Sequence, residues 1–352
     1  MRFLCCDLGG TSADWGIYDQ RAKDFVFRTS LRTVEFDDFY EMMDHLLAAY
    51  ASQFKHEISK IQHFVVGVAG PVGAESVRPT NLEGWEVKSI TLNSILRDHG
   101  HNEKSTIIND FESLAYGVLF KLSTGFSEND FQPIYGRLKT GIVRTGEDIG
   151  IRSLVCGPGT GLGIACLVEG LEMAGLPYII SSEGGHQSMA AETSEQYRYL
   201  GEGGSFRGKI SYEECLSHAG LVEIYNHFRR EDYAAEPNYS ITSSEVSFLA
   251  SQGKDQAATD AIELLCEILA NFCGNSALAF NADRGVFLWG GVMSKIPVDL
   301  LRARFKRLYV DRCKLDDRVA KVPVVLLNDR DLPLLGCAHR ASFENKNANT
   351  EA

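Results

Sequence analysis

A glycine-rich stretch in the middle of the chain decides the fold: Ser153-Leu154-Val155-Cys156-Gly157-Pro158-Gly159-Thr160-Gly161-Leu162-Gly163. Its apolar start predicts a strand, the glycine run predicts a tight turn, and the apolar residues from Leu162 to Val168 predict a second strand. Glycines in such a turn let backbone N–H groups approach an anion without a Cβ in the way. The stretch lacks the GK[ST] of a Walker A loop, and no helix follows as in the dinucleotide fingerprint. It therefore predicts a phosphate-binding hairpin, with a plain tight hairpin as the alternative.

The N-terminus repeats this pattern around Asp7-Leu8-Gly9-Gly10-Thr11, between apolar segments at 3–7 and 15–18. Thr11 adds a hydroxyl donor to the glycine turn, and Asp7 at the strand end has the oxygen chemistry to hold Mg²⁺ through water. The alternative is a simple hairpin in which the acid is a polar cap. Two strand–glycine turn–strand units suggest an internally duplicated architecture.

The remaining chain mixes strands and helices, which places it in the α/β class. Apolar runs predict further strands at 24–28, 64–69, 106–108, 285–288 and 322–327. Apolar residues at helical spacing predict helices at 39–50, 111–122 and 258–280, and a short helix near the C-terminus. The polar, glycine-rich residues 123–150 predict a connection with irregular strands.

Composition describes an ordinary globular chain of two domains. The chain has 352 residues, 44% hydrophobic and 23% charged, and a formal net charge of −12. Such an acidic chain is a poor partner for nucleic acid or for an anionic membrane. Its start reads as a strand instead of a signal peptide, and no apolar run approaches the ~20 residues of a membrane span. Nine scattered cysteines without a CxxC pair indicate reduced thiols and a cytoplasmic protein.

Asn109-Asp110 stands between a predicted strand and a predicted helix. Both residue types are preferred helix N-caps, which is the simpler interpretation. The functional interpretation is a carboxylate at the mouth of a cleft, where it accepts the proton of a substrate hydroxyl that attacks phosphorus.

Two further glycine pairs are candidates for ligand contacts. In Glu183-Gly184-Gly185-His186 the acid and the histidine have the spacing of half a metal site, but the glycines between them argue against the helix this would need. A loop that offers its polar groups to the hydroxyls of a polyol is the functional interpretation, and a surface turn is the alternative. Gly290-Gly291 follows an apolar strand, where it allows a flat ring to lie against the backbone or allows close helix packing.

In this order, the segments resemble the bacterial-type glucokinase family of the actin-like ATPase superfamily, from about residue 3 to about residue 340. The two glycine turns resemble its phosphate motifs, the second as GxGTGLG. The remaining segments that match the family's motifs are Thr80-Asn81 with Trp85, Ile108-Asn109-Asp110-Phe111, Glu183 to His186, Ser211-Tyr212-Glu213, Gly290-Gly291-Val292 and Leu334-Leu335-Gly336.

The resemblance implies a two-domain actin-like ATPase fold of the ribonuclease H-like type, with a cleft between a small and a large α/β domain. The small domain would comprise residues 1–121 with about 331–345, and the large domain residues 122–330. Residues 346–352 are expected to form a disordered tail.

The resemblance also implies transfer of the γ-phosphoryl group of ATP to the 6-hydroxyl of glucose. Asp110 would be the general base, and Asp7 would position Mg²⁺ through water. The residues expected to bind sugar are Asn81, Asn109, Asp110, Glu183, His186 and Glu213. The residues expected to bind ATP are Asp7, Leu8, Gly9, Gly10, Thr11, Gly157, Gly159, Thr160, Gly161, Gly290 and Gly291. ATP, Mg²⁺ and glucose are thus the expected ligands, and the oligomeric state, a homodimer included, stays open.

Three departures from the family pattern keep two other functions open. The run Ser12-Ala13-Asp14 replaces the usual amide and base, Trp85 lies one residue farther from Asn81, and His218-Ala219 replaces the usual Gly-Pro. The alternatives are a kinase for another hexose or an aminosugar, and a catalytically weak sugar-sensing protein of the same fold.

Overall fold

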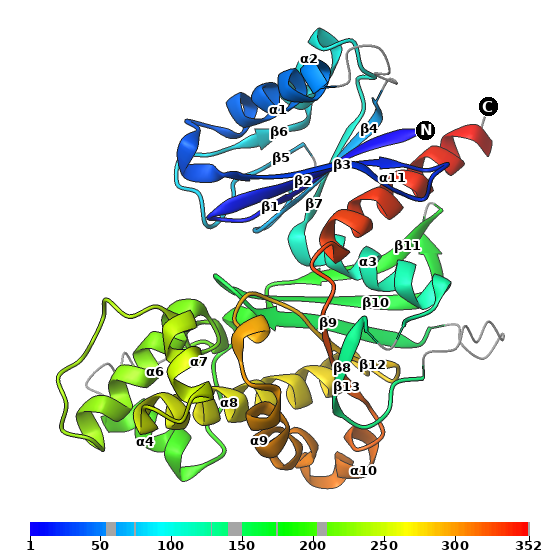
Figure 1. Cartoon of the computed structure of the whole chain (residues 1–352). Coiled ribbons are helices and arrows are strands. Elements are labelled where there is room, and N and C mark those ends of the chain that lie inside the picture. The colour runs from blue at the N-terminus through cyan, green and yellow to red at the C-terminus, as the bar shows by residue number, and fades with distance from the viewer. Residues whose placement is uncertain are drawn as a thin grey trace. The chain divides into compact units, whose positions relative to one another are not determined.

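The computed structural model describes residues 1–53, 61–73, 75–127, 129–139, 150–173, 175–202 and 210–350 (Figure 1). These residues form two compact units. The first comprises Met1–Thr124, Glu172–Ser181 and Arg330–Ala352, and the second comprises Gly125–Leu171 and Ser182–Asp329.

The first unit contains a five-stranded sheet in the order β3-β2-β1-β4-β7. Its strands are β1 (Arg2–Leu8), β2 (Ser12–Asp19), β3 (Asp24–Arg32), β4 (Ile61–Val68) and β7 (Ser105–Asn109). Strands β1 to β3 form an antiparallel meander, and β4 and β7 run parallel to β1. The carboxyl ends of β1, β4 and β7 therefore meet at one edge of the sheet.

Helices cover both faces of this sheet (Figure 1). Leu4 and Cys6 of β1 face a core shared with α1 (Phe39–Gln53) and α2 (Ser89–Asp98). Phe3 and Cys5 face a second core shared with α3 (Asp110–Thr124) and α11 (Leu332–Thr350). This alternation follows from the two-residue period of a strand. A short ribbon of β5 (Ser76–Val77) and β6 (Val87–Lys88) completes the unit, together with most of β11 (Leu176–Ser182).

Five strands of a six-stranded sheet belong mainly to the second unit, in the order β10-β9-β12-β13-β8. These strands are β8 (Phe131–Tyr135), β9 (Arg152–Pro158), β10 (Leu162–Met173), β12 (Gly285–Leu288) and β13 (Val324–Leu327). The helices of this unit are α4 (Ser194–Glu202), α5 (Tyr212–Cys215), α6 (His218–Glu231), α7 (Ser243–Ser251), α8 (Gln256–Phe280), α9 (Val298–Val310) and α10 (Asp316–Val319).

Helix α8 is the central helix of the second unit. It packs against α6, α7 and α9, and its apolar residues form the largest core of the unit. By length and composition alone it is also long and apolar enough to cross a membrane, but 78% of its most apolar window is buried in the fold. That burial is the property of a core helix in a folded domain.

The C-terminal helix differs from the prediction. We expected a short helix and a disordered tail from Lys346, whereas α11 extends through Thr350. Two contacts support this extension: Asn345 Nδ2 approaches His63 Nδ1 at 3.1 Å, and the Lys346 ammonium lies 5.8 Å from the centroid of the Phe343 ring.

The boundaries of the units also differ in detail from the expected domains. Residues 172–181 group with the first unit, although we expected them in the large domain. Within the expected irregular connection 123–150 the structure has the regular strand β8, and residues 128 and 140–149 lie outside the described part.

Candidate functional site

The β1–β2 hairpin brings the first predicted phosphate motif next to Asn81. The Gly9 N–H donates to the Ser12 carbonyl at 3.0 Å, which closes the turn. Thr33 fastens the turn from outside, because its hydroxyl donates to the Gly10 carbonyl at 2.9 Å. A Cβ on Gly10 would lie 2.9 Å from the Asn81 Cβ, so only glycine fits against this side chain. The two candidates thus lie in contact, with Asn81 exposed.

Three carboxylates gather at the edge where the parallel strands end. Asp14 of β2 is the register partner of Asp7 of β1, and Gly67 of β4 lies on the other side of Asp7. Burial, with the nearby charges of Asp110 and Asp14, raises the pKa of Asp7 to about 8. The structure therefore places Asp7 and Asp110 within electrostatic reach of each other.

Asn109 is the N-cap of α3. Its Oδ1 accepts hydrogen bonds from the backbone N–H groups of Phe111 at 2.9 Å and Glu112 at 3.3 Å. Its Nδ2 donates to the Gly70 carbonyl at 3.2 Å, and an amide nitrogen has a second hydrogen to donate. Asn109 therefore caps α3, as the simpler interpretation of the sequence predicts. The second N–H of its side-chain amide can still donate a hydrogen bond to a ligand.

Asp110 is the first residue of α3 and is partly exposed. Its Oδ1 accepts a hydrogen bond from the Phe111 N–H at 2.9 Å. An acid in the first turn is also stabilised by the helix dipole. This fixes the carboxylate at the same sheet edge as Asp7.

In the second unit, the β9–β10 hairpin is bound to a glutamate that is distant in sequence. The Gly159 N–H donates to the Gly161 carbonyl at 2.8 Å. The Leu162 N–H donates to Glu213 Oε2 at 2.8 Å, and a Cβ on Gly161 would lie 2.6 Å from the same oxygen. Glu213 therefore connects the predicted phosphate hairpin with the predicted sugar residues.

The predicted sugar residues of this unit lie together. Gly184–His186 form a 3₁₀ turn, and a Cβ on Gly185 would collide with the Leu162 carbonyl. His186 lies between two acids: its Nδ1 is 3.6 Å from Glu213 Oε1 and its Nε2 is 3.8 Å from Glu183 Oε2. The side chains of His186 and Glu183 are both 58% exposed, so these polar groups are open to a ligand.

Gly290-Gly291 lies beside the β9–β10 hairpin. The Val292 N–H donates to the Pro158 carbonyl at 3.2 Å, and a Cβ on Gly159 would lie 3.8 Å from the Gly291 nitrogen. Gly290 has φ +142°, and any side chain there would collide with the Pro158 carbonyl. The nucleotide candidates of the second unit are therefore contiguous.

Two residues near this point were not among the predicted site residues. The His218 N–H donates to the Gly159 carbonyl at 2.9 Å, and the His218 ring bonds to Ser243 Oγ at 2.7 Å. The departure from the family pattern singled out His218, but no sequence signal pointed to Ser243. Trp85, by contrast, is a core residue of the first unit and only 9% exposed.

The candidate residues thus form two clusters, one in each unit. The first, here called the acidic cluster, has Asp7, the Gly9-Gly10 turn, Asn81, Asn109 and Asp110. The second, here called the hairpin cluster, has the Gly157–Gly161 hairpin, Glu183, His186, Glu213 and Gly290-Gly291.

Comparison with known proteins gives one consistent result. The sequence profile of the family described as Glucokinase matches residues 4–343. A glucokinase from Chelativorans sp. (strain BNC1) is 29% identical over 336 residues, which cover 95% of this chain and 90% of that relative.

Solved structures agree with the sequence comparison. A glucokinase from an Antarctic psychrotroph superposes with a TM-score of 0.74 at 26% identity, covering 98% of this chain and 99% of that one. A glucokinase from Balamuthia mandrillaris, solved in complex with glucose, gives a TM-score of 0.76 at 20% identity, covering 97% and 93%. The predicted α/β fold of the actin-like ATPase type is confirmed.

Proposed function

The chain belongs to the glucokinase family and phosphorylates glucose with ATP, and we propose that the acidic cluster and the hairpin cluster divide this reaction between them. The observation that carries the part of the hairpin cluster is the contact of Glu213 with both His186 and the Gly161 hairpin. It joins polar groups for a sugar to a glycine hairpin for phosphates within one unit.

Asp110 is the general base of the proposed mechanism. It accepts the proton of the glucose 6-hydroxyl while the hydroxyl oxygen bonds to the γ-phosphorus and the bond from phosphorus to the ADP oxygen breaks. A carboxylate held within reach of the attacking hydroxyl is the kind of group that serves as a general base in such a transfer. Its support is its place at the sheet edge beside Asp7, at the first turn of α3.

The sugar hydroxyls meet Asn81, Asn109, Glu183, His186 and Glu213 in this proposal. Carboxylates accept from hydroxyls, and the free amide N–H of Asn109 and the His186 ring complete the set. A site that pairs every hydroxyl rejects epimers, because a misplaced hydroxyl leaves a buried polar group unpaired.

The residues present fit Mg²⁺. Asp7 supplies the oxygen chemistry that this ion prefers, and the crowding of Asp7, Asp14 and Asp110 is relieved by a cation. Among the described residues no group of three or more His, Cys, Asp or Glu side chains is placed to hold a metal ion. In this proposal the ion would be held by water and phosphate oxygens around a single Asp7 carboxylate. When bound, Mg²⁺ neutralises charge on the phosphates.

The two glycine hairpins hold the phosphates in this proposal, through Leu8, Gly9, Gly10 and Thr11 in one unit and Gly157, Gly159, Thr160 and Gly161 in the other. Their backbone N–H groups are the donors, and glycine keeps side chains out of the way. Gly290-Gly291 receives the adenosine part.

We place the enzyme in the cytoplasm, where ATP is available. All nine cysteines are free thiols and eight of them are buried, which suits a reducing compartment.

The test compares the wild type with Asp110→Asn and Asp110→Ala. ADP release coupled to glucose should fall by about 10²–10⁴-fold in kcat in both variants, while glucose binding measured by calorimetry persists. A panel of other hexoses and aminosugars controls for specificity. Near-normal turnover in either variant would refute Asp110 as the base, and a higher kcat/KM on another sugar would refute glucose as the preferred substrate.

A further inference from the structure

The structure places His218 beside the hairpin cluster. It opens α6, and its backbone N–H donates to the Gly159 carbonyl at 2.9 Å. Its Nε2 lies 3.0 Å from the position that a Cβ on Gly291 would take. One residue thus touches both glycine segments assigned to the nucleotide.

A hydrogen bond to Ser243 fixes the orientation of the His218 ring. Nδ1 bonds to Ser243 Oγ at 2.7 Å, and Ser243 is buried at 8% exposure in the first turn of α7. The Thr242–Glu245 capping box holds this end of α7 in place. Since the Nδ1 edge is engaged with Ser243, the opposite Nε2 edge is the one directed to Gly291.

The surroundings of the Nε2 edge are open. Gly291 is exposed, and Gly290 and His218 are partly exposed. Among the described residues, no hydrogen bond joins Nε2 to the protein. A polar ring edge that is held rigidly beside an exposed Gly-Gly backbone is suited to a flat ligand.

The charge of the His218 ring indicates which part of the nucleotide it contacts. Burial lowers the pKa of His218 below its ordinary value of ~6.5, so the imidazole is neutral at pH 7. A neutral ring gains little from a phosphate oxygen, whose charge is matched better by backbone N–H groups of the hairpin or by a cation. It is suited to the uncharged base and ribose.

We propose that His218 is a nucleoside-recognition residue, whose imidazole contacts the adenosine part of ATP where it lies against Gly290-Gly291. The inference rests on the proposed function, because it takes the hairpin cluster to be the nucleotide side. Ser243 is a positioning residue that acts through the ring of His218.

Direct binding measurements separate this role from a structural one. Calorimetry on the wild type, His218→Ala and Ser243→Ala would use ADP, adenosine and tripolyphosphate as probes. In His218→Ala we expect the affinity for ADP and for adenosine to fall about tenfold, with tripolyphosphate affinity unchanged. Ser243→Ala should change the same two affinities in the same direction by a smaller factor. Glu223→Ala, an exposed position on α6, is the matched control and should bind all three probes as the wild type does.

Steady-state kinetics provide the second readout. The KM for ATP should rise in His218→Ala by the factor seen for ADP affinity, whereas the KM for glucose should not change. Equal losses for tripolyphosphate and adenosine would overturn the inference, because they indicate a distorted hairpin. Unchanged ADP affinity in His218→Ala would overturn it as well. A wild type that neither binds ADP nor phosphorylates glucose would instead refute the proposed function itself.

Discussion

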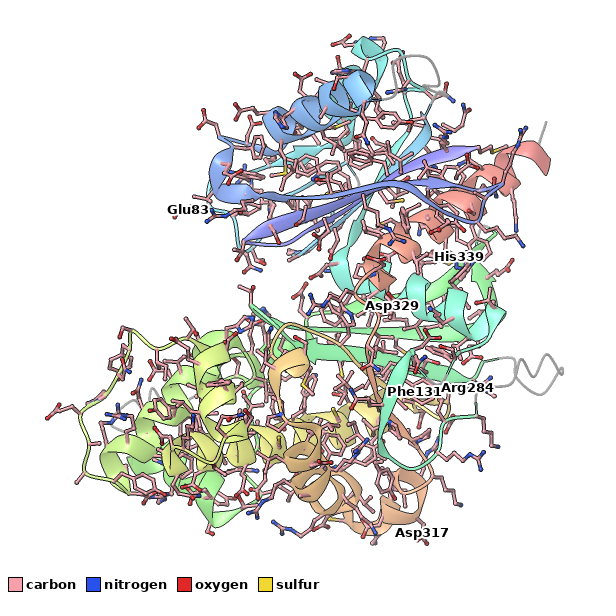
Figure 2. The ribbon with its side chains drawn as sticks, in the orientation of Figure 1. Glu83, Phe131, Arg284, Asp317, Asp329 and His339 are labelled. Carbon is pink, nitrogen blue, oxygen red and sulfur yellow. The ribbon has the colours of Figure 1, made fainter. Side chains whose placement is uncertain are left out.

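Replacing His339 by glutamine should remove an acid-sensitive contribution to the stability of the first unit. His339 lies on α11 (Figure 2), and its ring centroid is 5.5 Å from that of Phe120 and 4.7 Å from that of Phe343. Its Nδ1 bonds to the Tyr116 carbonyl at 3.2 Å, in the role of donor. Burial among these groups lowers the pKa of His339 to about 4.

The direction of the effect follows from proton binding. With an ordinary pKa of ~6.5 in the unfolded chain, the imidazole binds a proton more readily there than in the folded protein. Stability is therefore complete above about pH 6.5 and falls as the pH decreases toward the folded pKa of about 4. The two pKa values give a loss of about 2.5 kcal/mol between pH 7.5 and pH 4.5 from this one group. His63 contributes with the same sign, since burial lowers its pKa to about 4.

Urea unfolding at several pH values measures this loss. The free energy of unfolding of His339→Gln should decrease less than that of the wild type between pH 7.5 and 4.5, by about 2.5 kcal/mol. His63 and the carboxyl groups contribute equally to the pH dependence of both proteins, so their contribution cancels when His339→Gln is compared with the wild type. His45→Gln, at an exposed position on α1, is the control and should keep the wild-type pH dependence. If His339→Gln retains the full pH dependence, the burial argument is refuted.

Two further substitutions test contacts of the second unit. Gly161→Ala should raise the KM for glucose on the order of tenfold in steady-state assays. The new Cβ would lie 2.6 Å from Glu213 Oε2 and would displace that carboxylate. An unchanged KM for glucose would show that Glu213 does not bind the sugar. Arg284→Met should destabilise the protein by about 3 kcal/mol in urea unfolding (Figure 2 labels Arg284). The side chain of Glu169 is only 14% exposed, and the substitution removes the cation that lies 2.7 Å from it. Recovery of stability in the double variant Arg284→Met/Glu169→Leu would support this explanation, and a single variant as stable as the wild type would contradict it.

Local sequence patterns predicted most of the regular structure. The strand expected at 285–288 is β12 with the same bounds, and the helix expected at 111–122 is α3 with two or fewer residues added at each end. Both carry strong periodicity, and polar or glycine residues mark their ends. The C-terminal helix was underestimated because its last turns are polar, and contacts such as that of Asn345 with His63 hold them.

The site could be predicted as a set of motifs but not as a set of contacts. Nothing local in the sequence connects Glu213 with the Leu162 N–H, or His218 with Ser243, because the partners are 51 and 25 residues apart. Such pairs arise only when the strands and helices pack. The candidate residues can be predicted from the resemblance to a family, but the contacts between them depend on how the strands and helices pack.

The grouping of α11 with the first unit sets the order in which the protein is completed during synthesis. The ribosome delivers residues 1–124 early, yet the apolar face that carries Phe3 and Tyr116 must wait for residues 332–350 before it is covered. Until then, the nascent chain exposes that face to chaperones and proteases. A premature stop near residue 330 would leave every segment of the second unit in the chain, but it would remove α11 from the first unit. Chaperones and proteases would then recognise the uncovered apolar face of the first unit, although the deletion lies at the C-terminus.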